Sequence, residues 1–475
     1  MIPRGGVKYR YHRHLPDGFF LSDSPQRLRM MRDRLLCFLT VMLIGLGWTP
    51  GLSAQPAALP DRLDFEQAKA LMLEHNPSLR AAQAQSAQQT YAAELPTLWP
   101  NPSVNVSQDR IGLPSGGTDN QLFFNLGQTI PYPGELRARE RAASHLKTAA
   151  QQAYQEEAAR AFRDLRTRYL DVVAAAARVD VLQTITEVVR TATRAGDVRY
   201  QEGDFSTFSR ARLRVALAEF EDQLAQAETD AQNARLRLAY FILPDEAASY
   251  QRTRALADFA VEGSLEYRPV TMEYEGVLHR ALQMRGRLNA AQARIDARSQ
   301  QLRAARLQRI PSLNLSAGPK YQDTPAGTEW GYTAGLSLQI PLWNTGRTQI
   351  RAQQAQQQMA TAQAEAARRQ VEVQVREAFA EVQSYEKRID RISNDLLTDT
   401  DSLLQDARYV YSEGELSLVG LLDAMEATRS ARRLQIDLVA GYLRSLYQLE
   451  YAMGIGPRDP SPFLPQAFFQ ADASQ

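Results

Sequence analysis

Two long stretches of the chain carry sparse, regularly spaced apolar residues and almost no helix breakers. Glu135 to Arg199 contains no proline and one glycine, Gly196, and Thr348 to Tyr411 contains neither residue type. Each stretch spans about 65 residues, so a continuous helix would extend roughly 95 Å at 1.5 Å per residue. The apolar positions are mostly Ala, Val and Leu, which suits a coiled-coil wall one layer thick with solvent on both faces.

Each long stretch ends at a glycine-containing turn, and a second helical pattern follows it. Tyr200 to Gly203 and Tyr411 to Gly414 both read Tyr-x-x-Gly, which is typical of the tip of a helical hairpin. The return helices are expected at about Phe205–Ile242 and Leu416–Met453. Two further helical segments are expected at Gln67–Leu98, with a break at Pro77, and at Val277–Gln308.

Between these helical segments lie two regions in which apolar and polar residues alternate. Strand pairs are expected at about 102–131 and 311–341, around polar loops at 112–120 and 323–329. In the second pair Leu313 and Leu315 alternate with Asn314 and Ser316, so one face is apolar and the other polar. A soluble sheet covered on one side shows the same alternation, so the pattern alone does not identify a membrane sheet.

Aromatic residues mark the ends of the expected strands. This set is Trp99, Tyr132, Tyr321, Trp330, Tyr332 and Trp343. Such placement suits the two aromatic belts of a membrane interface. The alternative is a small aromatic core under a soluble sheet.

The order of the expected helices and strands is duplicated within the chain. Leu79 to Ala84 returns as Leu288 to Ala293, and three further landmarks return in the same order at offsets of 209 to 211 residues. We therefore expect five regions: an upstream extension and signal at 1–54, repeat 1 at 55–243, an inter-repeat segment at 244–275, repeat 2 at 276–456 and a tail at 457–475.

The N-terminus has the pattern of a secretory signal. Arginines precede an apolar run from Leu35 to Trp48, and small residues follow, with cleavage expected after Ala54. The run is short for a membrane span, although an N-terminal anchor is the alternative. Met30 or Met31 would begin a signal of ordinary length. Cys37 lies too early in the run for lipidation, so the exported chain is expected to lack cysteine.

Charge and motifs exclude several functions. The 55 basic and 54 acidic residues are balanced, so no nucleic-acid partner is expected. Gly-rich phosphate loops, His-Glu-x-x-His and Gly-x-Ser-x-Gly are absent from the sequence. His75, His145 and His279 are far apart, and Asp399-Thr400-Asp401 lacks the glycine and glutamate of a calcium loop. We expect no catalytic residue, no metal site and no cofactor.

Four strands per chain have a consequence for assembly. Four strands cannot close a barrel, and open sheet edges are not tolerated in lipid. A dimer would supply eight strands, but its barrel would be filled by side chains. A trimer would supply twelve and leave a lumen, so a conduit favours the homotrimer.

The order of these elements resembles the TolC-type outer membrane factor family over about residues 61–456. The residues that carry the resemblance are Leu63 to Ala68, Asn76 to Leu79, Gln128 to Pro131, Gln339 to Leu342, the two tips, and Leu421 to Ala424. The resemblance implies a mainly helical fold in which three duplicated protomers form a 12-stranded membrane barrel continuous with a periplasmic helical tunnel. It implies a passive exit duct in the outer membrane of a Gram-negative bacterium. The implied partners are outer-membrane lipid, a periplasmic adaptor and an inner-membrane transporter of the RND type.

The resemblance also implies where partners and gate lie. Adaptor contacts are expected at the tips, at Tyr200, Gly203, Asp204, Gly414, Glu415 and Leu416, although an ordinary helix turn explains the same residues. A periplasmic gate is expected around Tyr411, Gly420 and Asp423. Asp423 matches a position of the family's acidic rings, whereas Gly420 stands where an acid is common. The first copy offers Phe208 and Ser209, so three Asp423 carboxylates would give a weakly cation-preferring mouth.

The cargo is less defined by the sequence. Pro131 to Arg137 resembles a stretch of members that serve heavy-metal efflux, which places metal cations slightly ahead of drugs or other small molecules. This stretch joins strand to helix and would not bind metal. A periplasmic coiled-coil scaffold without a pore is the rival from another class, and it leaves the amphipathic strand pairs unexplained.

Overall fold

The structure is a computed structural model that describes residues 62–112, 114, 116–243, 259–340, 342–392 and 394–463, without the side chains of 394–401. The expected signal, its Cys37 and cleavage after Ala54 lie outside the described residues. So do residues 244–258 of the inter-repeat segment and residues 464–475 of the tail. The side chains of Asp399 and Asp401 also lie outside them.

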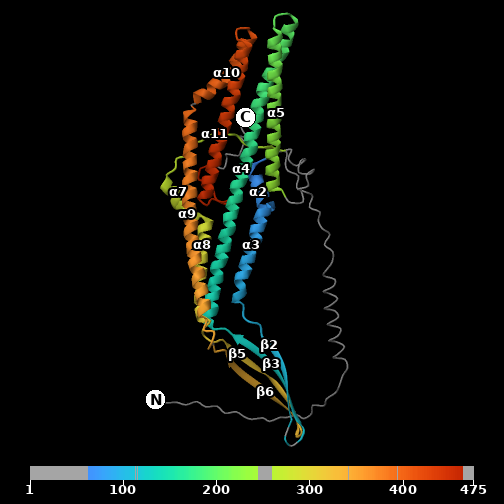
Figure 1. Cartoon of the computed structure of the whole chain (residues 1–475), viewed down its shortest axis with the longest axis vertical. Coiled ribbons are helices and arrows are strands. Elements are labelled where there is room, and N and C mark those ends of the chain that lie inside the picture. The colour runs from blue at the N-terminus through green and yellow to red at the C-terminus, as the bar shows by residue number, and fades with distance from the viewer. Residues whose placement is uncertain are drawn as a thin grey trace, which may run out of the picture. The chain divides into compact units, whose positions relative to one another are not determined.

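The chain folds as two copies of one plan (Figure 1). The first copy comprises α2 (Phe65–His75), α3 (Pro77–Glu94), η1 (Leu95–Thr97), β2 (Ser103–Gly112), β3 (Thr118–Ile130), α4 (Pro133–Gln201) and α5 (Thr207–Ile242). The second comprises α7 (Tyr274–Met284), α8 (Gly286–Leu307), β5 (Leu313–Thr324), β6 (Gly327–Leu338), α9 (Arg347–Arg391), α10 (Asn394–Ser412) and α11 (Leu418–Ala452). The predicted mainly helical fold with four strands is confirmed.

The four strands form one antiparallel sheet in the order β2-β3-β5-β6. The register pairs Val104 with Leu126 and Leu315 with Leu336, which places the alternating apolar residues on one face. The strands run further into the expected loops than the pattern indicated, since β5 and β6 are joined by two residues, Pro325 and Ala326. Outer strands β2 and β6 each have one edge without a neighbour in this sheet.

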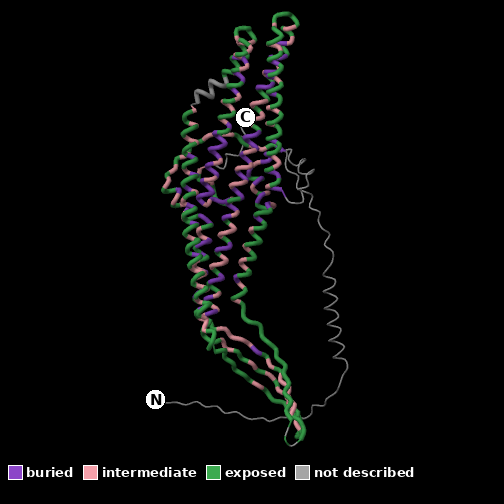
Figure 2. Tube along the Cα trace, in the orientation of Figure 1, coloured by how far each residue is buried: buried purple, intermediate pink, exposed green. Residues whose placement is uncertain are grey.

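The helices build a thin wall around several small apolar clusters. Helix α4 contacts α3, α5, α8 and α11 along its length. Figure 2 shows buried residues gathered along the middle of the helices and mostly exposed residues in the sheet. Two short strands, β1 (Arg62–Leu63) and β4 (Ala260–Val261), pair in parallel. The Tyr169 hydroxyl contacts this pair and donates to the Leu63 carbonyl at 3.0 Å. No helix among the described residues is long and apolar enough to cross a membrane.

The second long helix is interrupted, and here the expectation of one continuous helix was wrong. Helix α4 runs unbroken for 69 residues, but its counterpart divides into α9 and α10 after Arg391. Ile392 has left the helical region, at φ −92° and ψ 77°, and its N–H donates to Ile389 in a tight last turn. The sequence there is Ile392-Ser393-Asn394, and β-branched and short polar residues are poor helix formers.

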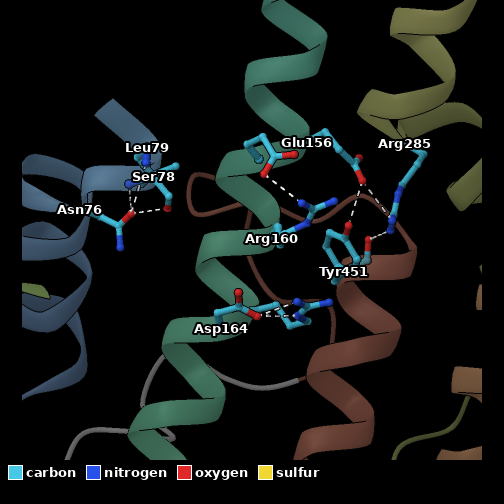
Figure 3. A network of polar contacts seen from close by, with 10 residues as sticks. Asn76, Ser78, Leu79, Glu156, Arg160, Asp164, Arg285 and Tyr451 are labelled. Atoms are coloured by element: carbon cyan, nitrogen blue, oxygen red, sulfur yellow. Dashed lines mark hydrogen bonds and ion pairs between the residues drawn. The ribbon is translucent and has the colours of Figure 1, made fainter. Parts of the chain in front are cut away.

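Both copies also break between their first two helices, and a polar side chain clamps each break (Figure 3). The Oδ1 atom of Asn76 caps α3 by accepting from Ser78 and Leu79, while its Nδ2 donates to the Phe241 carbonyl at 2.9 Å. Arg285 stands at the equivalent position and donates to the carbonyl of Tyr451.

The charge of Arg285 is balanced inside the protein. Arg285 is 1% exposed and forms an ion pair with Glu156 at 3.1 Å. The hydroxyl of Tyr451 donates to the same carboxylate at 3.0 Å (Figure 3). The second break was not predicted, because no proline marks it. These clamps join the helix breaks to the ends of the return helices α5 and α11.

Candidate functional site: hairpin tips and aromatic belts

Both hairpin tips close with the same backbone geometry. At the first tip Gly203 adopts φ +86°, its N–H donates to the Tyr200 carbonyl, and Asp204 N–H donates to the Arg199 carbonyl. At the second tip Gly414, at φ +82°, and Glu415 repeat the pattern. This is a Schellman closure, in which the left-handed residue is nearly always glycine. The expected tip residues Gly203, Asp204, Gly414 and Glu415 are all exposed.

The return helices begin with matching serine caps, and these caps fix the register between the copies. Ser206 Oγ accepts from Ser209 N–H, and Ser417 Oγ accepts from Gly420 N–H. In this register Gly420 corresponds to Ser209, and Asp423 corresponds to Arg212. Asp423 and Arg212 are both exposed, and neither has an ion pair within the described part of the chain. The cation Arg212 therefore holds the position in the first copy that matches Asp423, a match that the sequence analysis did not predict.

The two tip tyrosines differ in their surroundings. Tyr200 lies under the guanidinium of Arg210, whose Cζ is 4.5 Å from the ring centroid. Tyr411 is half-buried and packs with Leu416 against the apolar cluster that joins the two hairpins. Burial raises the pKa of Tyr411, with Arg199 acting in the opposite direction. Leu416 and Tyr411 are thus partly occupied by intrachain packing, unlike the exposed turn residues beside them.

The first tip carries a partly exposed ion-pair network. Asp197 accepts from Arg210 at 2.6 Å and from Arg214 at 3.0 Å, and these hydrogen bonds lower the pKa of the Asp197 carboxyl. Two apolar residues at the ends of the tip segments were not singled out as contact residues in the sequence. Phe208 is 74% exposed and its counterpart Val419 is 43% exposed. The signal that could have found them is their shared position, two residues after the capping serine.

The six aromatic residues lie in two groups at opposite ends of the sheet. Tyr321, Trp330 and Tyr332 lie near the β5–β6 turn, where Tyr321 and Trp330 stack edge to face at 5.2 Å. Trp99, Tyr132 and Trp343 lie at the other end, next to the helices. Trp343 is 93% exposed and Tyr332 is 88% exposed, so these rings are not a core under the sheet.

The apolar face of the sheet lies between these two groups and is uncovered. Its exposed members include Val104, Val106, Leu126, Leu315, Leu336 and Leu338. The opposite face carries mainly small and polar residues, such as Asn105, Asn125, Ser316 and Thr333. Within the described residues, no group of three or more His, Cys, Asp or Glu side chains could hold a metal ion.

Long helical hairpins that continue into an amphipathic sheet define a class of channel-forming proteins. A match to a protein family agrees with this class. The family model described as outer membrane efflux protein matches residues 70–242 and 277–455. The matched segments cover more than half of the chain, so it belongs to the outer membrane efflux protein family. Members of this family are passive outer-membrane channels and not enzymes. No curated protein sequence matches the chain.

Solved structures share this fold at low sequence identity. The Campylobacter jejuni CmeC outer membrane channel has 16% identity and a TM-score of 0.67, over 88% of this chain and 93% of CmeC. The Vibrio cholerae outer membrane protein VceC has 19% identity and a TM-score of 0.63, over 82% and 96%. The open state of the Neisseria gonorrhoeae MtrE outer membrane channel has 20% identity and a TM-score of 0.62, over 82% and 89%.

Proposed function

We propose that the chain is one protomer of a homotrimeric exit duct that carries substrates of an efflux pump across the outer membrane. The observation that carries this proposal is the four-stranded sheet with an uncovered apolar face, bordered at both ends by exposed aromatic residues. An apolar band flanked by aromatic girdles is typical of the outward face of a membrane β-barrel. Repeat 1 (55–243) and repeat 2 (276–456) each contribute one strand pair and one hairpin.

Fractionation and conductance test this proposal. The full-length chain should be recovered with outer membranes, and the purified protein should form discrete conducting channels in planar bilayers. A coiled-coil scaffold without a pore would be recovered in the soluble periplasm. Recovery there, or membrane protein that never conducts, contradicts the proposal.

At the closed mouth, Asp423 is the proposed source of a weak cation preference, with Tyr411 and Gly420 beside it. Support comes from its exposure at the start of α11, close to the tip. Arg212 at the matching position of α5 limits the preference, since three cations would accompany three carboxylates. We expect Asp423→Asn to lower cation preference and Arg212→Gln to raise it, measured by reversal potentials under a salt gradient. Unchanged reversal potentials in both variants contradict an electrostatic role.

The exposed tips are the proposed contact with a periplasmic adaptor. Beside Gly203, Asp204, Gly414 and Glu415, exposed Phe208 and Val419 supply the apolar area that a stable contact needs. We expect Phe208→Ser with Val419→Ser to abolish adaptor capture in cells while conductance remains normal. The matched control is Val215→Ser, which changes an exposed valine further from the tip. Equal capture by all variants contradicts this assignment.

The cargo is proposed to be metal cations, with drugs or other small molecules as the second candidate. The support is the resemblance of Pro131 to Arg137 to members that serve heavy-metal efflux. In the structure this segment connects β3 to α4, since Tyr132 holds the N-cap position of α4, without a side-chain capping bond, and Pro133 is the first residue of the helix. Cells that lack the chain should become sensitive to divalent or monovalent soft metals with unchanged drug tolerance. The opposite pattern would favour the second candidate.

A further inference from the structure

Within one chain, the two hairpins meet through an apolar contact between α4 and α11. Val189 and Ala192 of α4 share a buried cluster with Leu421 and Met425 of α11, which are 1% and 0% exposed. Beside this contact runs a groove lined by Ala195 of α4, Gln405 of α10 and Leu421. This arrangement shows how one hairpin of this protein sits against the next.

The duplication repeats both contact surfaces on the outer sides of the two hairpins. At an offset of 211 residues, α10 repeats the surface of α4, and α5 repeats that of α11. Helices α5 and α10 lie on opposite sides of the α4–α11 contact (Figure 1). Ala192 is 7% exposed, but its counterpart Leu403 is 40% exposed. Met425 is 0% exposed, whereas the side chain of its counterpart Arg214 is 54% exposed.

The repeated surfaces carry opposite charges, whereas the groove within the chain is lined by two arginines, Arg199 and Arg408, and by no carboxylate. Ala195 is replaced by Asp406 on α10, whereas Gln405 and Leu421 are replaced by Arg194 and Arg210 on the first hairpin. Within fifteen residues of its tip glycine, the first hairpin has six arginines and three carboxylates, and the second has two arginines and seven carboxylates. Arg194 and Asp406 are exposed, and neither has an ion pair in the part of the chain that the structure describes.

We propose that the acidic outer face of α10 docks on the arginine-rich outer face of the first hairpin in a second copy of this chain, with Asp406 paired to Arg194. The proposal rests on the homotrimer of the proposed function. Its geometry follows from the intrachain contact, because Ala195 and Gln405 line one groove and their counterparts are Asp406 and Arg194. Opposite charges favour this register, and they disfavour contact between two α10 helices or two first hairpins.

Around the mouth of the proposed trimer, joints within a chain then alternate with joints between chains. Near the tips, the joint within each chain centres on the apolar cluster of Val189, Ala192, Leu421 and Met425, and salt does not weaken such a contact. The joint between chains depends on exposed ion pairs, which are screened as ionic strength rises. Rising ionic strength should therefore weaken the three seams between chains more than the joints within each chain.

Paired cysteines test the seam directly. The sequence contains one cysteine, Cys37, so introduced thiols can be followed with little background. The full-length Arg194→Cys/Asp406→Cys variant is treated in membranes with a short bifunctional thiol reagent. We expect covalent trimers on a denaturing gel. The control is Ala195→Cys/Gln405→Cys at the equivalent positions within a chain, which should link internally and remain monomeric on that gel.

The outcomes separate this inference from the proposed function. If native electrophoresis shows a trimer but the 194/406 variant yields no covalent trimer, the seam is wrong and the duct stands. If native electrophoresis shows no trimer for the unmodified chain, both proposals are overturned.

Charge reversal tests the energetics of the same seam. Asp406→Arg should raise the fraction of time that the channel is open in bilayers by at least about threefold, because three exposed pairs are lost at once. Arg194→Asp combined with Asp406→Arg should restore the original fraction. A double variant that stays as open as the single variant overturns the pairing.

Discussion

Replacing Arg285 with methionine removes a buried cation from the clamp on the second helix break. Methionine keeps much of the apolar stem but none of the donors. The variant loses the bond to the Tyr451 carbonyl, the ion pair to Glu156 at 3.1 Å and the bond to Gln374 at 3.1 Å. Glu156 is 8% exposed and would be left without its counter-ion.

The expected loss of folding free energy follows from that uncompensated carboxylate. Removing one partner of a buried ion pair costs about 3–5 kcal/mol. The Tyr451 hydroxyl and the Arg287 N–H still donate to Glu156, which places the loss near 3 kcal/mol, the lower end of the range. Adding Glu156→Gln removes the buried charge, so the double variant should recover to within about 1–2 kcal/mol of the original protein.

Urea unfolding of the purified protein in detergent, followed by far-UV circular dichroism, measures these differences. The control is Arg268→Met, which breaks an exposed pair with Glu266 whose side chains are 55% and 51% exposed. That control should lose less than about 1 kcal/mol. A loss for Arg285→Met equal to the control would refute the reasoning, and so would a double variant that is less stable than the single one.

Three further predictions concern the tips, the tyrosines and the sheet. Gly203→Ala or Gly414→Ala should lower the free energy of unfolding, measured by urea titration, by about 1–2 kcal/mol. Both glycines are left-handed, and an added Cβ would meet open space, so the loss comes from the backbone conformation. Gly276→Ala in α7 should cause no loss. Burial, Asp390 and Glu386 raise the pKa of Tyr267 to about 12. The neutral Tyr267 hydroxyl should therefore contribute to stability in full below about pH 10, and this contribution should disappear as the pH rises through 12. Tyr267→Phe should remove that pH dependence. In vesicles, tryptophan fluorescence should be quenched more by lipids brominated near the headgroup than at mid-chain. Equal quenching at the two depths contradicts an interfacial belt.

Much of the fold could be predicted because its local signals are strong. The absence of Pro and Gly from 135–195 predicted α4, and Asn76-Pro77 predicted the break that the structure shows. Gly203 and Gly414 predicted the tips, where only a residue without Cβ adopts a left-handed conformation cheaply. Alternation in β5 and β6 predicted the apolar face, although not the full strand lengths.

The unpredicted features depend on contacts between distant residues. Arg285 breaks a helix without proline because its side chain is held by Glu156 and by the Tyr451 carbonyl. The division after Arg391 depends on several weak helix formers in succession, each of which a long helix often tolerates. The match of Asp423 with Arg212 follows from the 211-residue offset between the two tips, and the serine caps show that this offset continues into the return helices.

The unpaired outer edges of β2 and β6 also constrain how the protein is made. Each edge presents a row of backbone donors and acceptors along 10 residues of β2 and 12 residues of β6. In hydrocarbon every such group without a partner costs several kcal/mol, whereas in water the same edges invite pairing with any extended chain. In the proposed trimer, a single subunit is therefore unsuited to lipid and prone to aggregation until its neighbours arrive. We therefore expect insertion to accompany assembly, and the yield of inserted protein to rise more steeply than linearly with the supply of chains.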